Sequence, residues 1–168
     1  MIACSDTKAN DITENREKGV HHFVDDYRFN GTYDHPEKSL SRYLQYAFVL
    51  TPDFSTYADM NLWRQLESVA KNRWVGAFWQ EKGLLVIPTI SWSDARSFEF
   101  CFDGVEKGST VAIGMVGCKQ SKISFLRGYY AMLDRINPSK IICFGAPYQE
   151  MRGDLIVVDY RESRKVVR

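Results

Sequence analysis

Acidic side chains follow three of the apolar segments that have the pattern of strands. Asp25 and Asp26 end VHHFVDD, Asp53 follows AFVLTP, and Asp94 follows LLVIPTISWS. Carboxylates that meet at one place have two chemical uses. They can supply the oxygen ligands that Mg²⁺ or Mn²⁺ prefers, or a close pair can act as general acid and base. The sequence leaves both uses open, and a metal would be held by Asp25, Asp53 and Asp94.

The same aspartates also have ordinary structural explanations. Aspartate forms turns and caps helices, and Asp94 before Ala95 and Arg96 has the pattern of a helix cap. Successive side chains of a strand point to opposite faces. Only one of Asp25 and Asp26 is therefore expected to face a shared site, and the sequence does not say which.

Candidates for substrate binding occur at the same strand ends. Arg28 follows the first strand, and Lys119 follows a strand-to-helix turn that contains Gly117, so either cation could contact a phosphate. This turn lacks the glycine spacing of the nucleotide-binding motifs, and a plain tight turn explains it equally. Trp92 lies between two serines and could stack on a base or sugar, although packing against the sheet is the simpler explanation.

The elements that must position these residues alternate between strands and helices. Residues 58–83 and 118–139 have helical spacing, and six apolar runs predict strands, within residues 20–29, 47–55, 83–94, 109–117, 140–148 and 154–162. Three of the runs lack polar alternation, which is typical of parallel strands buried on both faces. We expect an α/β fold with a mostly parallel sheet of about six strands, either an open three-layer sheet or a partial barrel. Strand ends converge in such folds.

Length and composition restrict the class of protein. With 168 residues, 45% of them hydrophobic, the chain is expected to form one α/β domain over residues 19–168, preceded by a flexible tail over residues 1–18. A net charge of +1 argues against an acidic DNA mimic and against a general basic nucleic-acid coat. No run approaches the roughly 18 apolar residues of a membrane span, so we expect no membrane partner and a cytoplasmic location. Four widely spaced cysteines do not indicate a zinc site.

Three strings, VHHFVDDYRFNGTYDHPE, LTPDFSTYADM and VIPTISWSDARSFEFCFDGVEKGSTVAIGMVG, carry a family resemblance. The chain resembles a family of uncharacterised proteins found on phages, prophages, plasmids and integrative elements of Gram-positive bacteria. The resemblance covers roughly residues 20–146, and the strings occur in the same order in the family. The resemblance implies a cytoplasmic protein of a mobile element and supplies no reaction. It adds Gln80 and Ser93 to the candidate positions, and it also matches Asp25, Asp26, Asp53, Trp92 and Asp94.

Three functions fit these observations. The first is chemistry on a nucleotide or nucleic acid, assisted by Mg²⁺ or Mn²⁺, with the four aspartates as catalytic groups. Its substrate contacts would be Arg28, Gln80, Trp92, Ser93, Gly117 and Lys119. The second is non-catalytic binding to a host defence protein, with Trp63, Trp74 and Trp79 as anchors. The third, a weaker hypothesis, is binding to single-stranded DNA as an accessory of replication or transfer.

Overall fold

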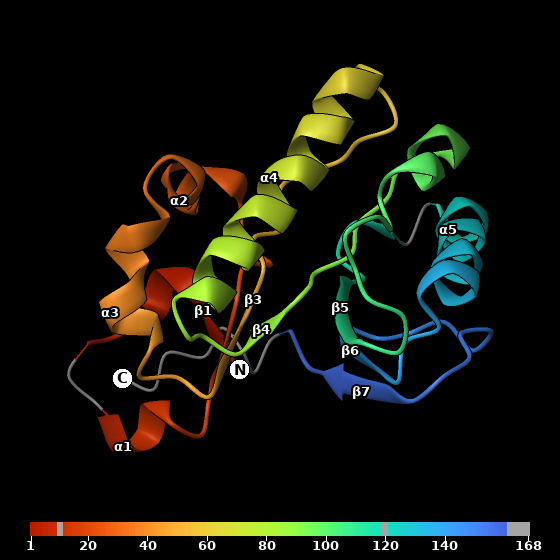
Figure 1. The fold of residues 1–168 in the computed structure, drawn as a ribbon. Helices are drawn as coiled ribbons and strands as arrows, with labels where there is room; N and C mark the ends of the chain where they lie inside the picture. Colours follow the sequence, from red (N-terminus) through yellow and green to blue (C-terminus); the bar gives the residue numbers. More distant parts are fainter. Residues whose placement is uncertain (10–11, 119–120, 161–168) are drawn as a thin grey trace.

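In the part of the chain that the structure describes, seven strands and two long helices form the fold (Figure 1). The computed structural model describes residues 1–9, 12–118 and 121–160. The strands are β1 (Ile2–Ala3), β2 (Gly19–His21), β3 (Phe48–Leu50), β4 (Val86–Ile87), β5 (Thr110–Gly114), β6 (Lys140–Phe144) and β7 (Leu155–Val158). The helices are α1 (Ile12–Asn15), α2 (Gly31–Asp34), α3 (Leu40–Tyr43), α4 (Leu62–Glu81) and α5 (Lys122–Ile136), with short 3-10 turns at Cys4–Asp6, Asp26–Arg28, Pro36–Ser39 and Ala95–Glu99.

Neighbouring strands pair in parallel and in the order of the chain. One sheet has the order β1-β2-β3-β4 and a second has the order β5-β6-β7. An isolated parallel bridge between Thr89 and Ala112 joins them just beyond β4. The prediction of an α/β fold with a parallel sheet is therefore confirmed. The described residues form seven strands in place of about six, and these strands do not close into a barrel.

The sheet curls strongly. The rings of His21 on β2 and Phe144 on β6 have centroids 4.5 Å apart, and Phe23 lies 4.6 Å from the same Phe144 ring. In a flat sheet β2 and β6 would be four strand spacings apart, about 19 Å. Side chains on the inner face thus meet across the curve, in a cluster that also includes Leu50 and Ala112. Of the two architectures expected, this is the partial barrel.

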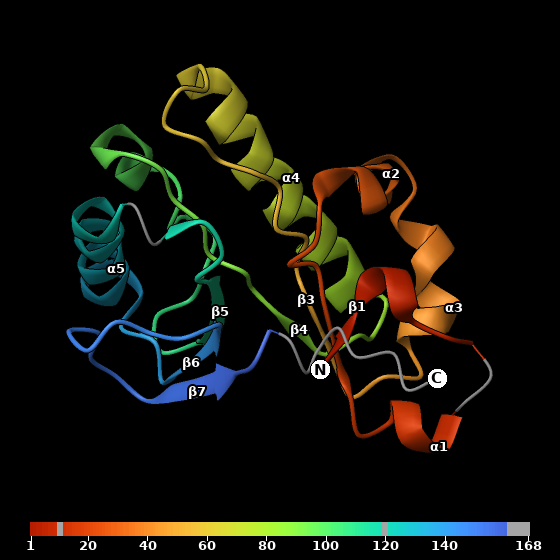
Figure 2. The same ribbon diagram turned by 180° about the vertical axis from the view of Figure 1, so that it is seen from behind.

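Helices cover the outer face of the curved sheet in two groups (Figure 2). The side chains of α4 and of the residues around α3 pack on β2 and β3, where Val75 and Trp79 are fully buried. On the other side α5 packs on β5 and β6 through Phe125, Tyr129 and Met132. Among the described residues, no helix has both the length and the apolar character needed to cross a membrane.

The N-terminal residues differ from the expected tail. Ile2 and Ala3 pair with Val20 and His21 as an edge strand, and Ala3 and Cys4 are buried. The sequence did not predict this strand, because two strand residues are too few to produce a recognisable period. Residues 10 and 11 lie outside the described part of the chain.

The buried face of α4 carries polar as well as apolar side chains. Polar Gln65 and Asn72 are buried there, whereas Trp63 is 60% exposed and Trp74 is 49% exposed. Polar residues can face the core here because each one satisfies backbone groups of neighbouring loops.

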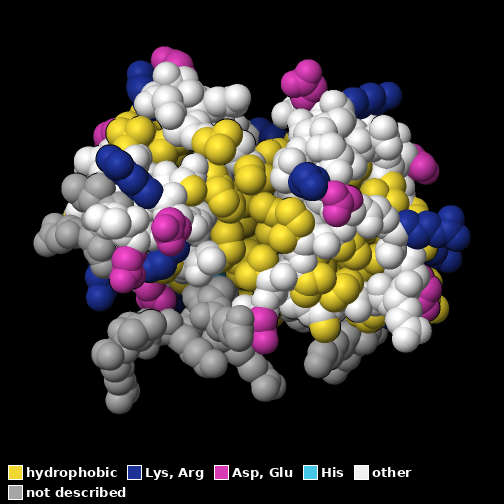
Figure 3. All heavy atoms as spheres, turned by 90° about the horizontal axis from the view of Figure 1, so that it is seen from below, with side chains coloured by type: hydrophobic (Ala, Val, Ile, Leu, Met, Phe, Trp, Pro, Cys, Tyr) yellow, Lys and Arg dark blue, Asp and Glu magenta, His cyan; other side chains and the backbone are white. Residues whose placement is uncertain are grey.

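At the lower side of the molecule, Figure 3 shows a broad gathering of hydrophobic side chains.

Candidate active site at the carboxyl ends of β2 and β3

Asp26 is fixed by two hydrogen bonds from one serine. It begins the 3-10 turn after β2, and Ser55 lies in the loop after β3. The Ser55 backbone N–H donates to Asp26 Oδ2 at 3.1 Å, and Ser55 Oγ donates to Asp26 Oδ1 at 2.9 Å. This contact answers the question that strand phase left open, because Asp26 turns toward the neighbouring strand end.

Asp25 points elsewhere. Its exposed side chain lines a shallow hollow of about 210 Å³ together with Asp6, Val24 and Arg28. Arg28 is exposed and lies over the Tyr27 ring, 5.4 Å from its centroid. Asp25 and Arg28 are therefore on the same rim as Asp26 but in a separate hollow, which the N-terminal segment helps to form.

Asp53 is the electrostatically unusual group of the rim. Its carboxyl is half-buried, and burial together with the negative charge of Asp26 raises the pKa of Asp53 to about 7. A carboxyl group with such a pKa exists in both protonation states near neutral pH, which is the property a general acid or base requires. Asp26 therefore lies near enough to Asp53 for its negative charge to act on the Asp53 carboxyl.

The backbone that carries Asp53 is held by a buried polar network. Asn72 of α4 donates from Nδ2 to the Pro52 carbonyl at 2.6 Å, and Thr51 Oγ1 donates to Asn72 Oδ1 at 3.0 Å. The Thr89 N–H donates to Thr51 Oγ1 at 2.8 Å, which ties the strand end of β3 to the segment after β4. This network fixes the position of Asp53, because satisfied buried hydrogen bonds resist rearrangement.

A third strand end contributes Cys118. Burial and the nearby charge of Asp53 raise the pKa of the Cys118 thiol to about 11, so the sulfur stays protonated at neutral pH and is a poor nucleophile. Gly117, just before it, has φ of +80°, the left-handed region that favours glycine, and therefore serves the turn. Lys119, expected to contact a phosphate, lies outside the described residues.

Asp94, Trp92 and Ser93, in the segment after β4, make contacts within the protein. Asp94 caps the 3-10 turn Ala95–Glu99 by accepting from the Arg96 N–H at 3.0 Å, and hydrogen bonds from the Arg96 side chain lower the pKa of Asp94. The Trp92 ring is half-buried, and its centroid lies 5.0 Å from that of Phe125. This contact favours a packing role for Trp92 over a role in stacking on a ligand. Ser93 Oγ donates to the carboxamide oxygen of Gln65, which fixes the loop.

Gln80 and the predicted metal ligands are not gathered around Asp53. Gln80 is exposed near the C-terminal end of α4, just before β4 begins, and so lies at the amino ends of the strands, away from the carboxylates. Among the described residues, no group of three or more His, Cys, Asp or Glu side chains is close enough to hold a metal ion. The structure places Asp25 and Asp94 in contacts of their own, beside Arg28 and Arg96, and the metal ligands remain a prediction.

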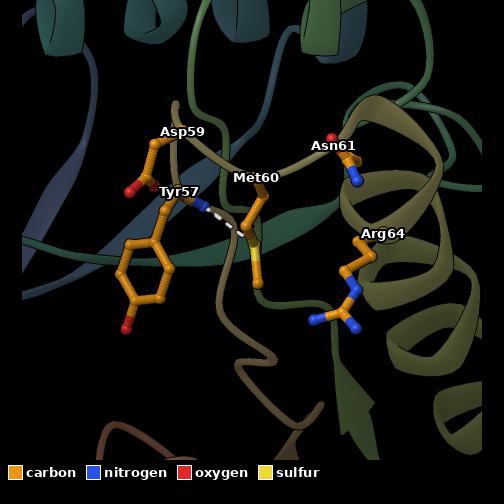
Figure 4. A pocket seen from close by; sticks show the side chains of 5 residues that line it. All are labelled: Tyr57, Asp59, Met60, Asn61 and Arg64. Carbon is orange, nitrogen blue, oxygen red and sulfur yellow. Dashed lines mark hydrogen bonds between the residues drawn. The ribbon is translucent and has the colours of Figure 1, made fainter.

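Sequence reasoning missed the part of the rim that follows Ser55. The Tyr57 hydroxyl donates to Ser55 Oγ at 3.0 Å, and Tyr57 lines a pocket of about 330 Å³ with Asp59, Met60, Asn61 and Arg64 (Figure 4). The string STYADMN directly after a strand end was the available signal, since loops at this edge carry ligand contacts in parallel folds.

The chain belongs to a phage-associated family whose function is unknown. The family described as "Domain of unknown function (DUF4417)" matches residues 1–161, which extends the resemblance seen in the sequence to include β1. "Gene 1 protein" of Mycobacterium phage L5 is 43% identical over 129 residues, 75% of this chain and 56% of that protein. "Gene 1 protein" of Mycobacterium phage D29 is 40% identical over 129 residues, 75% of this chain and 48% of that protein. The chain spans about half the length of these curated relatives, and no solved structure matches it.

Proposed function

We propose that the protein is a phage-associated enzyme that uses Asp26 and Asp53 as an acid–base pair on a nucleotide or nucleic acid. The observation that carries the proposal is the pKa of about 7 at Asp53, produced by burial and by the charge of Asp26 at the converging strand ends. Strongly shifted titratable groups in such positions are enriched in active sites.

Asp26 and Asp53 have different roles in a hydrolytic step. Protonated Asp53 donates its proton to the leaving oxygen, while the Asp26 carboxylate, oriented by Ser55, accepts a proton from the attacking water. The water oxygen forms the new bond to phosphorus as the bond to the leaving oxygen breaks. After product leaves, Asp26 releases the proton taken from water and Asp53 regains one from solvent. A Mg²⁺ or Mn²⁺ held by substrate phosphate oxygens would supply neutralising charge at this rim, and Asp53 would stay outside its ligands because it must carry the proton that it donates.

A hydrolysis assay with matched aspartate variants tests the proposal. Wild type, Asp53→Asn and Asp94→Asn are incubated with nucleotides and short oligonucleotides in chelator, Mg²⁺ or Mn²⁺. We expect turnover in wild type and Asp94→Asn, because an Asn side chain still caps a helix, and loss of at least about a hundredfold in Asp53→Asn. Equal turnover in wild type and Asp53→Asn contradicts the proposal. The metal conditions separate unassisted from metal-assisted chemistry.

Binding to a host defence protein is the second candidate, and the exposed face of α4 favours it. Trp63, Leu66 and Trp74 remain exposed there, and exposed tryptophans commonly anchor protein interfaces. Trp79, the third expected anchor, is fully buried against the core and is excluded. A host protein captured by wild type and by Asp53→Asn, but lost in Trp63→Ser/Trp74→Ser, would support this candidate. Equal capture by the double variant would contradict it.

The third candidate, binding single-stranded DNA without cleavage, is favoured by exposed aromatic rings beside arginines. Arg28 lies over Tyr27, and Arg64 lies 5.3 Å from the Trp63 ring centroid. Bases stack on such surfaces while arginines contact phosphates. Tight binding that weakens steeply with salt, without turnover, would favour this candidate. Weak binding that is insensitive to salt would contradict it.

A further inference from the structure

The pocket after Ser55 has two chemically different walls. In Figure 4, Asp59 and Tyr57 lie on one side, Asn61 and Arg64 lie on the other, and the Met60 side chain is between them. Its volume of about 330 Å³ lies at the lower end of the range of small-molecule sites. The arrangement suits a ligand with an aromatic, amino-bearing end and an anionic end.

The loop that forms this pocket is held in place by α4. Gln65 is fully buried, and its Nε2 donates to the carbonyl oxygens of Tyr57 and Met60, each at 3.0 Å. The Ser68 hydroxyl donates to the Ser55 carbonyl at 2.9 Å. The pocket is therefore preformed, so a ligand does not have to order the loop on binding.

Arg64 supplies an available cation at the pocket. It is exposed, and none of the ion pairs among the described residues includes it. Its guanidinium lies 5.3 Å from the Trp63 ring centroid, a contact that leaves its N–H donors available to phosphate oxygens. A guanidinium group presents several donors in a plane that match phosphate oxygens. On the opposite wall the Tyr57 ring, 59% exposed, offers a stacking surface, and the Asp59 carboxylate accepts hydrogen bonds from exocyclic amino groups.

We propose that this pocket binds a nucleoside phosphate, with its phosphate on Arg64 and Asn61 and its base between Tyr57 and Asp59. The site prefers cytosine, adenine or guanine to uracil or thymine, because only the first three bases carry the amino group that Asp59 accepts. The nucleotide comes either free or as one residue of a single strand. The inference rests on the proposed function for its link to chemistry, through the Tyr57–Ser55–Asp26 hydrogen bonds.

Calorimetric titration of the full chain tests the pocket without any need for turnover. The probes are cytidine monophosphate, uridine monophosphate, cytidine, inorganic phosphate and a short oligocytidylate. We expect cytidine monophosphate to bind more tightly than the other three small molecules. Arg64→Gln should reduce the affinity for cytidine monophosphate at least about tenfold. Arg127→Gln, at an exposed arginine of α5, should leave this affinity unchanged.

Three further variants separate the roles of the base-binding wall. Tyr57→Ala should reduce the affinity for cytidine monophosphate at least about fivefold, and Tyr57→Phe, which keeps the ring, should not reduce it. Asp59→Asn should reduce the preference for cytidine over uridine monophosphate. Binding of oligocytidylate alone, with loss in Arg64→Gln, supports a nucleotide that enters as part of a strand.

Unchanged affinity in both Arg64→Gln and Tyr57→Ala overturns the inference, and so does absence of binding by every probe. The result is distinguishable from failure of the proposed function, because Asp53→Asn is expected to keep cytidine monophosphate binding. If Asp53→Asn also kept full turnover, the acid–base proposal would fail while the binding result stood. If turnover depended on Asp53 but nucleotide affinity did not depend on Arg64 or Tyr57, only the proposed nucleotide-binding role of the pocket would be contradicted.

Discussion

Asp26 and Ser55, from the loops that follow β2 and β3, are joined by two hydrogen bonds of 2.9 and 3.1 Å that use both carboxylate oxygens. Because the backbone N–H and the hydroxyl of one residue make both contacts, the carboxylate is oriented as well as paired. This contact keeps the negative charge of Asp26 near Asp53, where it contributes to the raised pKa of that group.

Replacing Ser55 separates the two hydrogen bonds. Ser55→Ala removes the hydroxyl, its bond to Asp26 and the acceptor of Tyr57 Oη, but leaves the backbone N–H in place. We expect a loss of about 1 kcal/mol in the free energy of unfolding, together with reduced turnover, measured by urea denaturation and by the hydrolysis assay. Ser55→Thr keeps a hydroxyl and serves as the control. A stability loss without any effect on turnover would show that the contact does not position a working group.

Asp53 makes stability depend on pH. Its pKa is about 7 in the folded state and near 4 in unfolded chains. Between these values the folded state binds more protons, so the free energy of unfolding falls as pH rises from about 4 to about 7. Asp53→Asn removes this loss and should be more stable than wild type at pH 8, by at least about 1.4 kcal/mol, the equivalent of one pKa unit. Denaturation at pH 4 and pH 8 measures the difference, and a gap that does not grow with pH would contradict the raised pKa.

His22 should act in the opposite direction. It is buried, Nδ1 donates to the Leu50 carbonyl at 3.0 Å, and Nε2 accepts from the Tyr43 hydroxyl at 3.3 Å. Burial lowers the pKa of His22 to about 3. The unfolded state therefore binds more protons between about pH 3 and pH 6.5, and the free energy of unfolding rises with pH in that interval.

The imidazole resonances of His22 provide the measurement. In nitrogen NMR spectra they should show a neutral ring with the proton on Nδ1, unchanged from pH 4 to pH 8. His35, which is exposed, is the internal comparison in the same sample. A His22 titration with a midpoint above pH 5 would show that the ring is less buried than described here.

Gly128 allows Trp92 to pack against α5. A Cβ built at Gly128 would lie 2.2 Å from ring atoms of Trp92, so Gly128→Ala must displace the ring. We expect a loss of about 1–3 kcal/mol in the free energy of unfolding from overpacking. Gly31→Ala, where the added methyl meets nothing within 4 Å, should be neutral or slightly stabilising. Thermal and urea denaturation of both variants tests whether Trp92 is a core residue, and equal stability of the two would argue that it is not.

The strand-end pattern was enough to predict that Asp53 and one of Asp25 and Asp26 lie at neighbouring strand ends. Apolar runs predict strands, parallel strands converge at their carboxyl ends, and the carboxylates after them must therefore be neighbours. The choice between Asp25 and Asp26 needed the structure, because it depends on where the chain leaves β2. Asp94 follows the same pattern but turns to Arg96, a local contact that the cap pattern had already suggested.

Other features depend on contacts between distant parts of the chain. The curl of the sheet rests on rings of β2 and β6 that meet although more than 120 residues separate them, and no local pattern encodes this contact. The buried face of α4 also depends on such contacts, since Gln65 and Asn72 donate hydrogen bonds to loop carbonyls. Apolar spacing alone cannot reveal such polar packing.

The carboxyl titration of Asp53, followed by carbon NMR, tests the central claim most directly. Spectra of wild type, Asp26→Asn and Asp53→Asn are recorded from pH 3 to pH 9, and the resonance absent from Asp53→Asn identifies the group. We predict a midpoint near pH 7 in wild type, and a lower midpoint in Asp26→Asn because the neighbouring charge is gone. A midpoint below about pH 5 in wild type would mean an ordinary surface carboxylate and would contradict the acid–base pair.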